Sequence, residues 1–156
     1  MLGGGLLLNL LRPEVVGVRD LVPGECLYIR AADADTEGNG RRTGTGAAAV
    51  LALFAEGAER AGCDLSHSHE VVSTTTFAEN AIAPYPGAAA LQDRLRMACD
   101  AAFTTYVGHA VEGSELDLIV GVPDATAWAA PVRTGVCLVA RHDGEFLAGP
   151  AKGSGR

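Results

Sequence analysis

Residues 88–122 read AAALQDRLRMACDAAFTTYVGHAVEGSELDLIVGV, a helical pattern followed within a few residues by a strand pattern. The apolar residues of the first part recur at three- and four-residue steps, which places them on one stripe of a helix over residues 88–108. They are Leu91, Leu95, Ala98, Ala102 and Tyr106. Residues 115–122 are almost continuously apolar, which is typical of a buried strand. A helix followed by a buried strand predicts a fold in which helices pack on a sheet.

The rest of the chain extends this pattern to an α/β fold, more exactly an α+β two-layer sandwich. A second helix is expected over residues 45–61, because its apolar positions repeat with helical spacing, and Gly62 is expected to end it. Further strands are expected at residues 14–22, 26–32, 70–82, 132–141 and 145–148. The predicted order is ββαβαββ, with both helices on one face of a mixed sheet.

Length and composition place the chain among globular proteins. A chain of 156 residues predicts one domain, residues 1–156, in which residues 1–12 and 150–156 are loose ends. With 12 basic and 19 acidic residues the net charge is −7, which argues against nucleic acid and anionic membranes as partners. The apolar start, Met1–Leu11, has no basic residue ahead of it and is too short to span a bilayer.

The four cysteines indicate the expected compartment. Cys26, Cys63, Cys99 and Cys137 lie far apart in sequence, which excludes the close pairs of a zinc knuckle. Each lies in an apolar run, as buried free thiols do. We therefore expect reduced cysteines in a cytoplasmic protein, with two disulfides as the alternative.

A glycine-rich loop over residues 36–46 is the first candidate binding site. Its glycines allow close backbone approach to a ligand, and the following helix would offer free amide donors to an anion or a carbonyl. The substrate-binding candidates here are Glu37, Asn39, Arg41, Arg42, Thr43 and Thr45. The loop matches neither a Walker loop nor a dinucleotide fingerprint, so no organic cofactor is expected.

The stretch Ser66–Glu70 is the second candidate. In an extended segment His67 and His69 would point to one face and could bind a divalent metal, with Asp64 or Asp124 as a third ligand. The alternative is that both histidines are simply solvated at a junction between loop and strand.

Two motifs resemble those of the ring-opening amidohydrolases, the cyanuric acid hydrolases and barbiturases. They are Thr36-Glu37-Gly38-Asn39-Gly40 and Ala78-Glu79-Asn80-Ala81-Ile82-Ala83-Pro84-Tyr85. The resemblance implies a unit of a threefold arrangement, similar to one subunit of a chorismate-mutase-like trimer. The family's lysine falls on Asp35 and its serine nucleophile on Thr75, so the family's chemistry does not carry over directly.

From these observations we expect a small-metabolite enzyme that works at a subunit interface by general acid–base chemistry. It would hydrolyse or isomerise a small cyclic amide or carbonyl compound, with Glu79, Asp35 and Thr75 as catalytic residues and Asn80 contacting the substrate. The expected partners are a small polar or anionic metabolite and further copies of the chain, most naturally in a homotrimer. A metal-dependent enzyme using His67 and His69 and a non-catalytic ligand-binding or structural oligomer are the alternatives.

Overall fold

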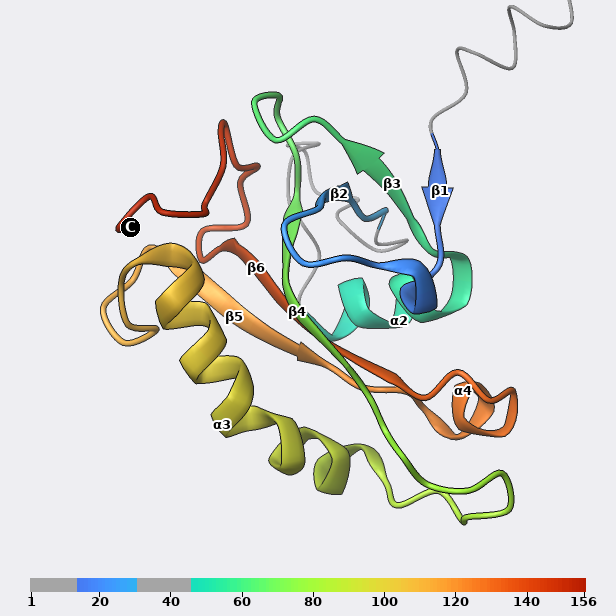
Figure 1. Ribbon diagram of the computed structural model, residues 1–156. Coiled ribbons are helices and arrows are strands. Elements are labelled where there is room, and N and C mark those ends of the chain that lie inside the picture. Colours follow the sequence, from blue (N-terminus) through green and yellow to red (C-terminus); the bar gives the residue numbers. More distant parts are fainter. Residues whose placement is uncertain (1–13, 31–45) are drawn as a thin grey trace, which may run out of the picture.

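The computed structural model describes residues 14–30 and 46–156, which form one six-stranded sheet with helices packed against it (Figure 1). The strands lie in the order β1-β3-β2-β4-β6-β5, and every neighbouring pair is antiparallel. The strands are β1 (Val15–Val16), β2 (Cys26–Tyr28), β3 (Ala58–Ala61), β4 (His69–Thr76), β5 (Leu116–Gly121) and β6 (Thr134–Arg141). The helices are α2 (Gly46–Glu56), α3 (Ala88–Val107), α4 (Ala125–Ala129) and the 3₁₀ turn η1 (Val18–Asp20).

The expected α+β class is confirmed, but two details of the expected sheet are wrong. The sheet is antiparallel throughout rather than mixed, and α2 and α3 lie on opposite faces of it (Figure 1). Successive side chains of β6 show this directly. Val136 and Leu138 pack in the cluster that contains α2, whereas Cys137 and Val139 pack in the cluster that contains α3. Because strand side chains alternate between faces, the two clusters lie on the two sides of the sheet.

The predicted helix at residues 45–61 is shorter than expected because Gly57 interrupts it. Gly57 has a φ of +82°, a left-handed conformation in which its amide still bonds to the carbonyl of Leu53. Its Cα lies so close to the Val16 carbonyl that a Cβ would overlap the oxygen. Residues 58–61 therefore leave the helix and form β3, which pairs with β1 and β2.

Other boundaries also differ from the expectation. The strand expected at residues 14–22 is divided into β1 and η1, and the strand expected to reach residue 82 ends at Thr76. Residues 145–148 form no strand, although Leu147 makes a single bridge to His67. The short helix α4 was not predicted. Asp124 caps it by accepting a hydrogen bond from the amide of Ala127 at 2.7 Å.

All four cysteines form disulfides, so the expectation of reduced thiols is wrong. Cys26 is bonded to Cys63, which ties β2 to the turn after β3, and Cys99 is bonded to Cys137, which ties α3 to β6. The sequence separations are 37 and 38 residues, so each disulfide closes a long loop of the chain.

The C-terminal segment is docked rather than loose. Ala151 is fully buried, the amides of Gly153 and Gly155 bond to the carbonyls at the end of α3, and Arg156 lies beside Glu115. In the part of the chain that is described, no helix combines the length and the apolar character needed to cross a bilayer.

Candidate functional site

A buried polar cluster, which we call the Glu70 cluster, lies where β4 meets α3 and the C-terminal segment. It comprises His67, Glu70, Tyr106 and the backbone amide of Ala151. One oxygen of Glu70 lies 2.8 Å from His67 Nε2 and accepts from the Ala151 amide at 2.6 Å. The other accepts from the Tyr106 hydroxyl at 2.9 Å. The Glu70 and His67 side chains are fully buried, and the carboxylate connects three separate parts of the chain.

The partners of His67 identify the cluster as an ion pair. Nδ1 lies 2.7 Å from the carbonyl oxygen of Leu65, which only accepts, and Nε2 faces the Glu70 carboxylate. Burial opposes the charge on His67, but the hydrogen bonds to Glu70 and Leu65 outweigh it and raise its pKa. Burial opposes the Glu70 charge too, yet the hydrogen bonds from His67, Ala151 and Tyr106 lower the pKa of Glu70. Burial and the Glu70 charge in turn raise the pKa of the Tyr106 phenol.

His69 occupies a different environment from His67. Its Nδ1 lies 2.8 Å from the hydroxyl of Ser68, and that hydroxyl also bonds to the backbone of Leu27 and Ile29 on β2 and just beyond it. Burial, with a contribution from His67, lowers the pKa of His69 to about 4, so the ring is neutral near pH 7. Its Nε2 has no hydrogen-bond partner among the described residues.

One group of potential metal ligands lies within the described part of the chain, and it differs from the predicted pair of histidines. Atoms of Cys26, His67 and Glu70 lie within 4.8 Å of one another, and His69 does not belong to the group. A thiolate is the form of cysteine that binds metals, and the sulfur of Cys26 is bonded to Cys63 instead. With the disulfide formed, the group is a structural ion pair beside a disulfide, and we assign it no metal.

The predicted catalytic residues are spread along the fold. Thr75 is an exposed residue near the end of β4, opposite Gly135 of β6. Glu79 forms an ion pair with Arg94 of α3, and the hydrogen bond from Arg94 lowers the pKa of Glu79. A general acid at neutral pH needs a raised pKa instead. Asp35 lies outside the described residues.

Of the predicted substrate-binding residues, one lies in the described part of the chain and the others lie outside it. Asn80 lies in a turn, where its side chain accepts from the amide of Ile82 at 3.2 Å. Sequence reasoning missed Arg133, which holds this turn by donating to the carbonyls of Glu79 and Ala81 and lies 4.4 Å over the ring of Trp128. The loop candidates, Glu37, Asn39, Arg41, Arg42, Thr43 and Thr45, lie outside the described residues.

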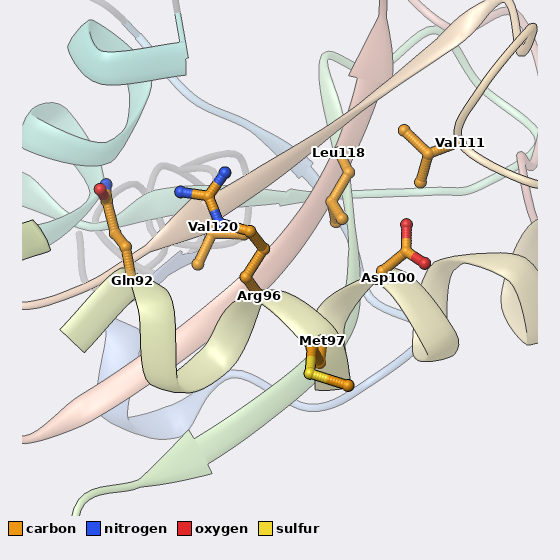
Figure 2. Close-up of a pocket in the computed structure, with 7 residues that line it drawn as sticks. All are labelled: Gln92, Arg96, Met97, Asp100, Val111, Leu118 and Val120. Atoms are coloured by element: carbon orange, nitrogen blue, oxygen red, sulfur yellow. The ribbon is translucent and has the colours of Figure 1, made fainter. Parts of the chain in front are cut away.

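The accessible feature that the sequence did not predict is a groove between α3 and β5, shown in Figure 2. Its volume is about 570 Å³. The groove is lined by Gln92, Arg96, Met97 and Asp100 from α3, by Leu118 and Val120 from β5, and by Val111. Figure 2 shows Val120 toward the Gln92–Arg96 end and Leu118 toward Asp100, so helix and strand run in opposite directions along the groove. Met97, which is 84% exposed, lies at the border of this groove.

A second apolar hollow lies near the end of β5. It is about 350 Å³ in volume and is formed mainly by α2, the start of α3 and the last residues of β5. Ile119 and Val120 line it, and Val120 also lines the groove. Val120 of β5 therefore borders both the groove, which carries charged residues, and the apolar hollow. The sequence signal for this surface is the almost continuously apolar run at residues 115–122, which by itself predicts only a buried strand.

Comparison with known proteins identifies one family. The family model described as septum formation matches residues 48–152, more than half of the chain. Searches among curated proteins and among solved structures find no match. The match overturns the resemblance to the ring-opening amidohydrolases, which rested on two short motifs, one of them in a glycine-rich loop. It likewise overturns the expected enzymatic function and the expected hydrolase activity on cyclic amides, because the matched family is one of septum formation.

Proposed function

Since the chain belongs to the septum formation family, we propose that it is a non-enzymatic domain that acts in the building of the division septum, in an oxidising compartment. The observation that carries the role is the family match over residues 48–152. The placement of the polar residues supports the absence of catalysis. His67 and Glu70 are buried against each other, and Glu79 is paired with Arg94. Among the described residues, these groups stabilise the fold rather than face a substrate.

The two disulfides support the compartment. Disulfides persist outside the reducing cytosol, and they are rare in ordinary cytosolic proteins. The expectation of a cytoplasmic location depended on reduced cysteines, and the cysteines are paired. We therefore propose a location outside the cytoplasm.

Complementation tests the role and the compartment separately. In cells that lack the protein, we expect delayed or misplaced septa by microscopy, and rescue by a copy that is exported. A copy retained in the reducing cytosol should not rescue. Normal septa without the protein would contradict the role, and rescue by the cytosolic copy with four free thiols would contradict the compartment.

The absence of catalysis is tested with two variants in the same cells. Glu79→Gln and Thr75→Val should rescue as well as the wild type, because neither side chain has a chemical task under this proposal. A loss of rescue by a variant that folds and is exported normally would contradict the non-enzymatic role.

A further inference from the structure

The two edges of the sheet are built differently. One edge is β1, which has two residues, and short edge strands are a common protection against unwanted pairing. The other edge is β5, which has six residues and a single charged side chain, Asp117. That carboxylate is engaged by His142, whose Nδ1 lies 2.9 Å away. An apolar edge strand of this length that residues 14–30 and 46–156 leave unpaired on its outer side is suited to pairing with another strand.

The outward-facing backbone groups of β5 follow from its pairing with β6. The amide of His142 donates to the carbonyl of Glu115, and the register continues with Asp117 opposite Ala140 and Ile119 opposite Leu138. In an antiparallel ladder every second residue bonds to the partner strand. Asp117, Ile119 and Gly121 therefore bond to β6, while the amides and carbonyls of Leu118 and Val120 point outward, where the described residues supply no partner.

We propose that β5 pairs with β5 of a second copy of this chain, antiparallel about a twofold axis at Ile119. This register places Leu118 of each copy opposite Val120 of the other. The two residues with outward backbone groups therefore form hydrogen-bonded pairs across the axis. It also places Asp117 opposite Gly121, so no two carboxylates face each other. Two six-stranded sheets become one continuous sheet, and the open edge disappears.

The charges of the groove fit the same axis. A twofold axis perpendicular to the sheet keeps both α3 helices on one face and sets them antiparallel across the interface. Arg96, whose guanidinium lies 3.7 Å from Asp93 of the same helix, and Asp100 lie one helical turn apart on the groove side of α3, and the proposed axis brings Arg96 of each copy toward Asp100 of the other. The apolar part of the surface comes from Leu118 and Val120 of β5, which line the groove beside these charges. The surface is thus complementary to itself in backbone, apolar and charged groups.

This self-complementarity is the reason to prefer a second copy over an unrelated partner. An isologous interface on a twofold axis closes at two copies, so the proposal is a dimer rather than the trimer expected from the sequence. It does not rest on the proposed role in septum formation, and its test uses the purified protein alone.

A charge exchange tests the proposal by sedimentation velocity and native mass spectrometry over a concentration series. The single variant Arg96→Glu brings an acidic side chain at position 96 of each copy opposite Asp100 of the other. The single variant Asp100→Arg brings a basic side chain at position 100 of each copy opposite Arg96 of the other. We expect each variant to raise the dimer dissociation constant at least about tenfold. An equimolar mixture of the two should form a heterodimer, because both cross-axis pairs are then of opposite charge. The double variant should dimerise with itself.

Controls carry the same charge changes on η1, whose residues line neither the groove nor the second hollow beside β5. Arg19 and Asp20 are exposed there, so Arg19→Glu and Asp20→Arg should leave the dimer intact. A monomeric wild type at every concentration would overturn the proposal and leave the edge to a different partner. A dimer that is insensitive to both single variants would overturn the interface.

A backbone variant tests the strand pairing itself. Leu118→Pro removes an outward amide and leaves the bonds of β5 to β6, because Pro is tolerated on an edge strand where its nitrogen faces outward. We expect a folded monomer by circular dichroism and sedimentation. A folded variant that still dimerises would overturn β5 pairing. If the variant does not fold, the charge exchange remains the deciding experiment.

Discussion

Replacing Glu70 with Gln tests whether the Glu70 cluster stabilises the fold. The carboxylate accepts hydrogen bonds from Tyr106 and from the amide of Ala151, and it pairs with His67. A glutamine keeps one oxygen, so Tyr106 can still donate to it. The new amide group would face the Ala151 N–H and the charged ring of His67, which are both donors. Breaking a buried ion pair from one side costs about 3–5 kcal/mol, because the other charge stays buried and unpaired.

The assay is equilibrium unfolding in urea with the disulfides intact, followed by the fluorescence of Trp128, the single tryptophan. Glu79→Gln is the matched control, because it makes the same chemical change in an ion pair with Arg94 that is partly exposed. We expect only a small loss there, since exposed pairs contribute little. Hydrogen exchange of the Ala151 amide adds a local readout and should become faster in Glu70→Gln. Equal losses in the two variants, with unchanged exchange at Ala151, would refute the structural role of the cluster.

Three further predictions concern the cysteines, His69 and the packing of β6. Replacing either disulfide by paired Cys→Ala changes should cost about 2–5 kcal/mol in urea unfolding. The loss should be larger for Cys99–Cys137, because both residues are buried and their replacement leaves voids. A larger loss for Cys26–Cys63 would contradict this explanation. His69 should make the free energy of unfolding depend on pH. As the pH falls from 6.5 to the folded-state pKa of about 4, the free energy of unfolding should decrease by up to ~1.4 kcal/mol per pH unit, because the unfolded chain binds a proton that the buried, neutral ring does not bind. The slope should be shallower in His69→Gln, and equal slopes would exclude His69 as the cause. Gly135→Ala should lower the free energy of unfolding by about 1–3 kcal/mol, because a Cβ would overlap the side chain of Leu95. Gly149→Ala, where a Cβ meets nothing within 4 Å, is its control and should change little.

The elements with strong periodicity were predictable from the sequence. The helix expected at residues 88–108 is α3, and the apolar run at residues 115–122 is β5, each within two residues of the observed bounds. Their patterns are unambiguous because each element buries a full stripe or face. The strand β3 was missed because Ala58 continues the helical spacing of α2, and only the φ of Gly57 ends the helix.

The placement of the helices was predicted wrongly although the sequence contained the signal. Residues 134–140 of β6 are all buried, and a strand that is apolar on both sides needs a layer on each face of its sheet. The disulfides could not be paired from the sequence, because the separations of the four cysteines do not say which strands and helices become neighbours. The groove was missed for a related reason: its residues come from α3 and β5 and gather only in the folded chain.

The residues that first attracted a chemical interpretation show why a reactive residue type is weak evidence for a reaction. A catalytic group needs access to a substrate and a pKa suited to proton transfer. His67 and Glu70 have no access, since each is buried and satisfied by the other, and Glu79 has a lowered pKa because Arg94 stabilises its charge. The apolar residues of β5, which first appeared to be ordinary core, are the ones that the described fold leaves with unpaired backbone groups at its edge. The carboxylates of Glu70 and Glu79 are thus paired within the fold, whereas the described residues leave outward backbone groups on β5, and a strand edge of this kind is suited to the recognition that the proposed role requires.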